Sequence, residues 1–296
     1  MPIKYECRGC GIRKNDPWEG RCPNPRCQRF FNYRRVNSDK GGKWEGSVED
    51  TVVALGDIKV PNVDFLETGV DGFDYVTSGG DTKRRGVAAG GIYLLCGSPG
   101  SGKSTLLAQV LRGLAQRRHS VLYVAGEEPL DQFRDRIRNI GKIPARFQAV
   151  RPRHMTVDDI LDRADEVKPR VVAIDSIQCV EVDDDLEIGS TSSIKAAIRV
   201  LSTYAKDEMV TMIIIGHITK DGAIGGPKTL EYLVDVSLYL QGRPNQSERY
   251  LRCDSKNRFT RTGVLARFQM TDKGLVEIGV PGDDLSREAP RSPKSQ

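Results

Sequence analysis

The sequence has 296 residues, with 45 lysine and arginine residues against 40 aspartate and glutamate residues, so its formal net charge is +5. This mild positive excess permits nucleic-acid binding but does not by itself indicate it. No apolar run approaches the ~20 residues that cross a bilayer, which excludes a chain made of membrane helices. The opening residues, MPIKYECRGC, lack the apolar stretch of a signal peptide, so we expect a cytoplasmic protein.

Four of the seven cysteines lie close together at the start of the chain. A pair spaced Cys-x₂-Cys is followed by a pair spaced Cys-x₄-Cys, in a segment with too few apolar residues for a core of its own. Such pairs are typical of a tetrahedral zinc site, whose binding energy folds the segment. The alternatives are a redox pair at the first two cysteines or a segment without metal. We predict a zinc finger over residues 1–35 and a linker over 36–59, with the zinc ligands Cys7, Cys10, Cys22 and Cys27.

The most informative motif is a glycine-rich loop that follows an apolar run at 92–96 and precedes a helical pattern at 106–111. A strand, a G-x-x-x-x-G-K-[ST] loop and a helix in this order are typical of a nucleoside-triphosphate site, because loop amides and the helix dipole favour phosphate. Lys103 would reach the β- and γ-phosphates, and the Ser104 hydroxyl would bind Mg²⁺. The predicted nucleotide-binding residues of the loop are Gly97, Ser98, Pro99, Gly100, Ser101, Gly102, Lys103, Ser104 and Thr105.

Apolar runs recur after this loop, with helical patterns between them. Continuous runs of valine, isoleucine and leucine favour parallel strands buried on both faces, and their alternation with helices predicts an α/β fold with a doubly wound sheet. The last third of the chain favours antiparallel strands. We predict one ATPase domain over residues 60–280 and a disordered tail over 281–296. The expected strands after the loop are 121–125, 148–150, 171–174 and 212–216, then 236–240, 249–253, 265–269 and 275–278.

The polar residues that end these runs are the candidate catalytic groups, since ligands bind at the carboxyl ends of the strands in such folds. Glu127 and Glu128 follow the first run; Glu127 is the better placed to activate water, and a plain helix N-terminal acid is the alternative. Asp175 ends the third run, as a Mg²⁺-linked aspartate does. His217 ends the fourth, where it would sense the γ-phosphate or serve as a structural histidine.

Two segments after these strand ends have loop-like compositions. Residues 181–193 are acidic and then rich in serine and threonine, and residues 220–228 are rich in glycine with a lysine at each end. Long loops beside a nucleotide site often carry function, although a solvated connection is the default.

Together these features resemble the bacterial RadA family, also called Sms, of RecA-like ATPases in DNA recombination. The resemblance extends from about residue 5 to 280. The two most specific motifs are GHITKDG…GPK, which begins at residue 216, and KNRF, at residues 256–259. The other shared features are Trp18-x-Gly20-Arg21-Cys22-Pro23, the TG…FD…GG pattern at Thr68, Gly69, Phe73, Asp74, Gly79 and Gly80, GSPGSGKST, LYVAGEE and IDSIQ.

The resemblance implies a RecA-like core that hydrolyses ATP with Mg²⁺, forms a ring such as a hexamer, and acts on single-stranded or branched DNA, with a recombinase as a further partner. It also implies that Lys256 and Arg258 contribute to a neighbouring subunit's ATP site; a basic β-turn is the alternative. The sequence departs from the family at Thr260, where the motif has glycine, and in the C-x₄-C pair. We also expect the family's C-terminal Lon-protease-like domain to be missing here.

We therefore predict a DNA-dependent ATPase with branch-migration or helicase-like activity. The loop at 220–228 follows His217 directly, so we expect Lys220 and Lys228 to bind DNA phosphates, with the basic zinc finger as the alternative grip. Two other functions remain open at this point. One is a P-loop kinase, and the other is a RecA-fold switch in which ATP drives assembly without a DNA motor.

Overall fold

The computed structural model describes residues 4–7, 10–14, 22–24, 26–27, 33–36, 63–152, 155–182, 186–217, 230–242 and 246–278. They belong to two units, Met1–Asn62 and Val63–Gln296. The expected linker at 36–59, apart from Val36, and the expected tail at 281–296 lie outside the described residues, as do Lys220 and Lys228. None of the described helices combines the length and apolarity needed to cross a membrane.

The first unit contains a small antiparallel sheet in the order β2-β1-β3. Strand β1 (Lys4–Cys7) pairs with β2 (Arg13–Lys14) on one side and with β3 (Tyr33–Val36) on the other. Glu6 is buried and forms an ion pair with Arg13 at 2.7 Å, which ties β1 to β2. This sheet frames the cysteine cluster described below.

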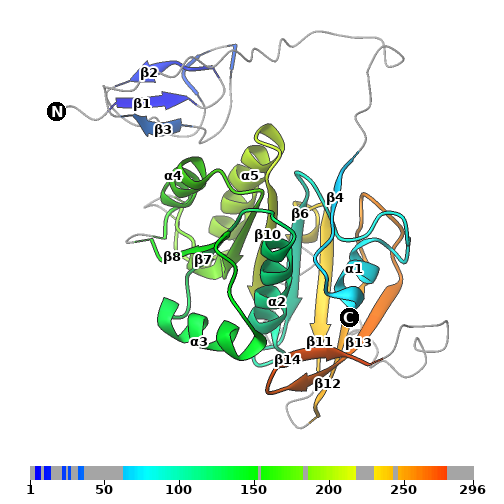
Figure 1. Cartoon of the computed structure of the whole chain (residues 1–296). Helices are drawn as coiled ribbons and strands as arrows, with labels where there is room; N and C mark the ends of the chain where they lie inside the picture. The colour runs from blue at the N-terminus through cyan, green and yellow to red at the C-terminus, as the bar shows by residue number, and fades with distance from the viewer. Residues whose placement is uncertain are drawn as a thin grey trace. The chain divides into compact units, whose positions relative to one another are not determined.

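The second unit is built on a nine-stranded sheet in the order β14-β13-β12-β11-β6-β10-β9-β7-β8 (Figure 1). Its central strands are buried along their whole length, as their continuous apolar runs predict. The parallel strands are β6 (Ile92–Gly97), β7 (Val121–Ala125), β8 (Phe147–Val150), β9 (Val171–Asp175), β10 (Thr211–His217) and β11 (Val236–Gln241).

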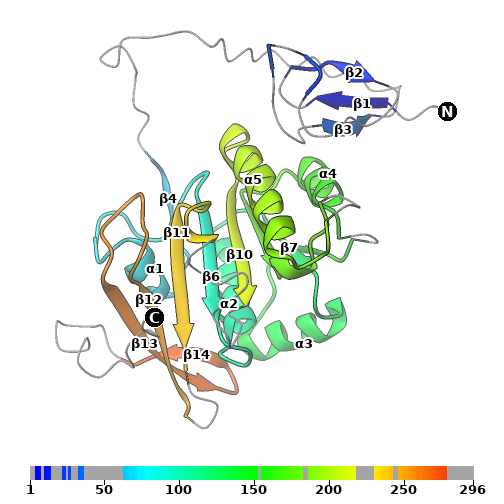
Figure 2. The same ribbon diagram turned by 180° about the vertical axis from the view of Figure 1, so that it is seen from behind.

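Helices cover both faces of this sheet, so the predicted doubly wound architecture is confirmed (Figure 2). One face packs against α1 (Asp71–Thr77), α2 (Lys103–Gln116) and α3 (Leu130–Ile140). The opposite face packs against α4 (Val157–Val167) and α5 (Thr191–Asp207). Successive residues of a strand point to opposite faces, so each central strand contributes to both hydrophobic layers.

The C-terminal strands differ from the sequence expectation at one point. Strand β11 runs antiparallel to β12 (Glu248–Cys253) but parallel to β6, so it completes the parallel part of the sheet. Strands β13 (Val264–Thr271) and β14 (Gly274–Glu277) then extend the sheet in antiparallel fashion. A separate two-stranded pairing joins β4 (Phe65–Leu66) to β5 (Val87–Ala88).

The segment expected as a loop at 181–193 also ends differently. Ser190 caps the N-terminus of α5, and its side chain accepts a hydrogen bond from the Ser193 amide at 3.2 Å. Serine is a preferred N-cap residue because its oxygen satisfies an amide that has no partner within the helix. The serine-rich end of this segment is therefore the start of a helix.

Candidate active site

The glycine-rich loop joins the end of β6 to the start of α2. Gly100 and Gly102 have φ angles of +75° and +100°, a region that favours glycine. At Gly97 a Cβ atom would lie 2.4 Å from the carbonyl oxygen of Leu240 in the neighbouring strand. The path of this loop therefore depends on glycine at three positions.

Lys103 is the first residue of α2 and is only 4% exposed. Its Nζ atom donates hydrogen bonds to the carbonyl oxygens of Gly97 at 2.9 Å and Ser98 at 3.1 Å, so the ammonium group lies across the loop. Burial lowers the pKa of Lys103, although the Asp175 carboxylate opposes this shift. A buried ammonium whose hydrogen bonds go to neutral carbonyls is well suited to a polyanionic ligand.

Asp175 ends β9 and is 3% exposed. The Tyr123 hydroxyl donates a hydrogen bond to its Oδ2 atom at 3.0 Å. Burial raises the pKa of Asp175, and hydrogen bonds from Ser104 and Tyr123 oppose the shift without cancelling it. A buried carboxylate beside a serine hydroxyl suits a divalent cation, since carboxylate, hydroxyl and water oxygens are the ligands of Mg²⁺ in phosphate sites.

Glu127 lies just after β7 and is bound on two sides. Its Oε1 atom accepts a hydrogen bond from the Ser176 hydroxyl and lies 2.7 Å from His217 Nε2. Burial favours the neutral acid, but the hydrogen bonds from Ser176 and His217 outweigh it and lower the pKa of Glu127. With a side chain that is 40% exposed, Glu127 is an ionised carboxylate that water can reach.

Glu128 has different surroundings from its neighbour in sequence. Its Oε2 atom forms an ion pair with Arg136 of α3 at 2.7 Å, and its side chain is only 16% exposed. Burial raises the pKa of Glu128, with Arg136 opposing the shift. Of the two candidate bases, Glu127 is the one that contacts the other strand-end residues.

The register of the parallel strands explains why these groups meet. His217 of β10 pairs with Gly97 of β6, and Ala125 of β7 pairs with Asp175 of β9. The Gly126 amide then donates a hydrogen bond to the Asp175 carbonyl at 2.7 Å, which fixes the turn before Glu127. The phosphate loop and three polar strand ends therefore share one edge of the sheet.

Lys256 and Arg258 lie away from this edge. The Arg258 amide donates to the carbonyl of Asp235, whose own amide donates to the carbonyl of Ile92 at the start of β6. The Arg258 guanidinium forms an ion pair with Asp235 at 3.1 Å and is 54% exposed. Lys256 Nζ donates to the carbonyls of Glu231 and Tyr232, at 2.8 and 3.1 Å. The structure thus separates Arg258 from the phosphate loop of its own chain.

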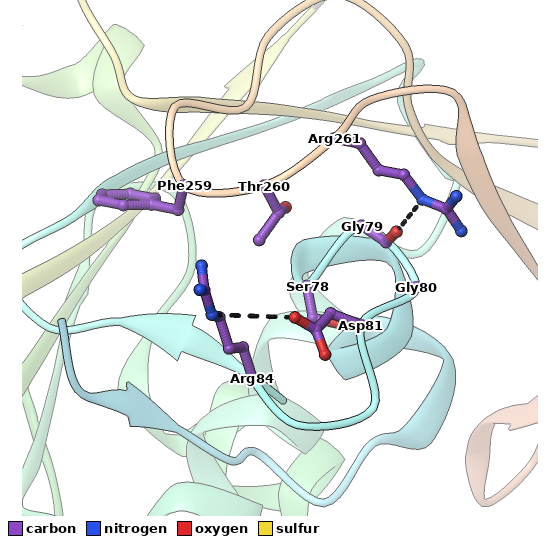
Figure 3. A pocket seen from close by; sticks show the side chains of 8 residues that line it. All are labelled: Ser78, Gly79, Gly80, Asp81, Arg84, Phe259, Thr260 and Arg261. Carbon is purple, nitrogen blue, oxygen red and sulfur yellow. Dashed lines mark hydrogen bonds and ion pairs between the residues drawn. The ribbon is translucent and has the colours of Figure 1, made fainter. Parts of the chain in front are cut away.

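The turn that carries these two residues rests on the C-terminal end of α1. Asn257 Nδ2 and Thr260 Oγ1 both donate to the Thr77 carbonyl, at 2.9 and 3.2 Å, and Arg261 Nε donates to the Gly79 carbonyl. A cavity of about 340 Å³ lies between this turn and the loop after α1 (Figure 3). Thr260, which replaces a glycine of the family motif, therefore supplies a hydroxyl that helps to hold the turn.

The four N-terminal cysteines form one cluster in which all the Sγ atoms lie within 4.8 Å of one another. The Sγ atoms of Cys7 and Cys27 are 3.6 Å apart, as are those of Cys10 and Cys22. Four thiolates at 2.3 Å from a tetrahedral zinc ion are separated by about 3.8 Å, so this donor set fits zinc. Residues 22 and 27 come together despite their wider spacing.

Sequence reasoning did not identify two residues that shape the site, Ser176 and Tyr123. Ser176 follows Asp175 directly and contacts Glu127, while Tyr123 lies two residues before the end of β7 and contacts Asp175. Both contacts cross between strands, so they depend on the register of the sheet. The available signal for Tyr123 was a polar group two positions from a strand end, on the same side as that end.

Comparison with known proteins identifies the fold. The AAA domain family matches residues 84–223. The solved structure of a KaiC-like protein from Pyrococcus horikoshii OT3 covers 73% of this chain, and the match covers 100% of that protein, with a TM-score of 0.59 and 22% sequence identity. The predicted RecA-like P-loop fold, with its antiparallel C-terminal strands, is therefore confirmed.

Curated proteins named DNA repair protein RadA match nearly the whole chain. The Haemophilus influenzae protein is 34% identical over 284 residues, or 94% of this chain and 60% of that protein. The Escherichia coli K12 protein is 36% identical over 94% of this chain and 60% of its own length. For the Mycobacterium tuberculosis H37Rv protein the values are 34%, 95% and 57%. The chain thus spans about 60% of the length of these relatives, and over that span it belongs to the RadA family.

Proposed function

We propose that this chain binds ATP with Mg²⁺ at its glycine-rich loop, hydrolyses it, and acts on DNA. The observation that carries the proposal is the meeting of Lys103, Asp175 and the Glu127–His217 pair at one edge of the sheet. The match to the AAA domain family supports ATP hydrolysis. The name of the RadA relatives supports DNA as the partner, and single-stranded or branched DNA is the form that we propose.

The environment of each residue supports a separate role. Lys103 and the loop amides would hold the phosphates, while Ser104 and Asp175 would hold Mg²⁺. The ion supplies positive charge to the phosphate oxygens when it is bound. Glu127, ionised and accessible to water, would accept a proton from the attacking water. His217 holds the Glu127 carboxylate and is followed directly by residues 218–229, so a change at the phosphate would reach that loop without a long relay.

We further propose that Arg258 and Lys256 act on the ATP of a neighbouring copy. Arg258 lies at the level of Ile92 and the phosphate loop begins at Gly97. The strand between them is about 17 Å long at ~3.3 Å per residue, which is too far for an arginine of the same chain. Residues on opposite edges of one domain meet when copies assemble head to tail, as in a ring. Transition-state charge on phosphate is commonly stabilised by an arginine supplied in trans.

We assign zinc to the four-cysteine cluster, on the basis of its sulfur separations. For DNA contact we propose Lys220 and Lys228, whose charges flank the glycine-rich loop after His217. Lysines on a flexible backbone bind phosphates without reading bases, so we expect little sequence preference.

ATP hydrolysis, measured with and without single-stranded DNA, tests the proposed function. Lys103→Ala should lose nucleotide affinity. Glu127→Gln should bind ATP normally and hydrolyse it about 100-fold or more slowly, because the amide cannot accept the proton. Glu128→Gln, the matched control, should hydrolyse ATP at a near-native rate. Native hydrolysis by Glu127→Gln would contradict the assigned base, and ATP binding without any hydrolysis in the native chain would favour an assembly switch.

The same assay tests the DNA contact. DNA should stimulate the native chain. The double variant Lys220→Ala with Lys228→Ala should lose DNA affinity while keeping ATP affinity, and its salt dependence should flatten by roughly 0.7 per lost phosphate contact on single strands. Unchanged DNA affinity in this variant would move the DNA contact to the basic N-terminal unit.

A further inference from the structure

Arg249 is a charged residue on the buried side of strand β12. It is 6% exposed, and the residues that share its side of the strand, Leu251 and Cys253, are completely buried. Its Nε atom donates a hydrogen bond to the carbonyl oxygen of Ser101 at 2.9 Å, and Nη1 donates to the carbonyls of Glu248 and Gln246. Within the described part of the chain no carboxylate pairs with it. Arg249 therefore connects β12 to the phosphate loop through neutral acceptors alone.

The neighbouring backbone leaves room for this side chain. A Cβ atom at Gly242, which follows β11, would lie 2.3 Å from Arg249 Cδ and 2.7 Å from Nε. Any larger residue at position 242 would displace the guanidinium. The position of Arg249 beside the loop is therefore enforced by a glycine that has no other close contact of this kind than Arg249 itself.

The contact with Ser101 has a direct effect on the direction of the loop amides. In a trans peptide the carbonyl and the following N–H point in opposite directions. Because Arg249 holds the Ser101 carbonyl toward β12, the Gly102 N–H is aimed to the other side of the loop. Amides at the start of a helix that point in this way form the anion-binding face of such loops.

The charge of Arg249 acts in the same direction. A guanidinium removed from water loses hydration that neutral carbonyls return only in part. A phosphate anion in the loop would supply the missing negative charge, as it would for Lys103. The buried arginine is thus more favourable when the loop is filled than when it is empty.

We infer that Arg249 is a positioning residue of the phosphate loop, which fixes the Ser101–Gly102 peptide and places a second buried positive charge beside the bound phosphates. This inference rests on the proposal that the loop binds ATP. It assigns to the C-terminal half of the sheet a part in nucleotide binding.

Nucleotide affinity of the full chain, measured by calorimetry with ADP and ATP, tests this role. Arg249→Met should weaken both affinities roughly tenfold or more, because charge-assisted hydrogen bonds are worth that much. Arg249→Lys keeps the charge without the planar fork and should recover part of the loss. Arg252→Met is the matched control; this arginine of the same strand pairs with Asp254 and its loss should leave nucleotide affinity unchanged.

A second variant covers the case in which Arg249→Met does not fold. Gly242→Ala pushes the guanidinium aside but keeps it in the chain, so it should also weaken nucleotide binding. In each folded variant, the unfolding temperature without nucleotide should change less than the stabilisation that ATP adds. Native affinity in Arg249→Met or in Gly242→Ala would overturn the inference. If the native chain binds ATP tightly but never hydrolyses it, the proposed ATPase activity fails while the role of Arg249 stands.

Discussion

At the scale of single residues, the site shows how neighbours in sequence acquire different chemistry. Glu127 and Glu128 are both partly buried, yet the pKa of the first is lowered and that of the second is raised. Two hydrogen-bond partners stabilise the Glu127 carboxylate, whereas one ion pair does not fully compensate Glu128 for burial. Sequence ranked Glu127 first because of its position after the strand. The hydrogen bonds that support this ranking come from β9 and β10, so they depend on tertiary structure.

Asp74 provides a pH-dependent prediction at this scale. It is completely buried after the TG motif and accepts hydrogen bonds from the Thr68 amide, the Thr68 hydroxyl and the Gly69 amide. Burial outweighs these bonds and raises the pKa of Asp74 from 3.8 to about 6. The folded state thus holds the proton more tightly than the unfolded state, so stability from this group is present below pH ~4 and is lost as pH rises through about 6.

Chemical unfolding between pH 4 and 7 checks this sign. Asp74→Asn does not titrate, so the native chain should lose stability relative to this variant as pH rises, by about 3 kcal/mol for a shift of roughly two pKa units. A constant offset is also expected, since one amide oxygen replaces two carboxylate oxygens. If the difference between the two chains grows in favour of the native chain at higher pH, the hydrogen bonds outweigh burial and the carboxylate is stabilised.

At the scale of elements, sequence predicted most of the strands and the groups at their ends. Continuous apolar runs identified β6, β7, β9 and β10 because parallel central strands are buried on both faces. Their order in the sheet was not predictable, since β10 lies between β6 and β9 although it follows both in the chain. For the same reason the contacts of Ser176 and Tyr123 were missed. The direction of β11 was also missed, because parallel and antiparallel strands share the same apolar content.

The four-cysteine cluster gives a prediction at the scale of one small unit. We expect one zinc ion per chain, and Cys22→Ser should lower that content to near zero, because three remaining thiolates bind zinc far more weakly. Metal analysis of freshly purified protein measures this directly. Cys179→Ser is the control, since Cys179 lies outside the cluster. Native zinc content in Cys22→Ser would show that the ion is held elsewhere.

At the scale of the whole molecule, the two halves of the proposed catalytic machinery lie at opposite ends of one strand. The phosphate loop leaves the carboxyl end of β6, and Arg258 is tied through Asp235 to its amino end. The supports of the turn, Asn257, Thr260 and Arg261, fix it against α1 and leave the guanidinium of Arg258 more than half exposed. A rigidly held, exposed arginine far from its own ATP site is arranged to serve another chain.

Mixing two inactive variants tests this arrangement. An Arg258→Ala chain keeps an intact phosphate loop, and a Lys103→Ala chain keeps its arginine, so hydrolysis should reappear where the first chain receives the arginine of the second. In a head-to-tail ring mixed at random in equal amounts, roughly a quarter of the interfaces combine both intact parts. The control replaces the Arg258→Ala chain with one that carries both substitutions, and this mixture should stay inactive. If mixtures that demonstrably exchange subunits regain no activity, Arg258 acts within its own chain or not on ATP at all, because exchange alone would then have created every interface that the trans mechanism needs.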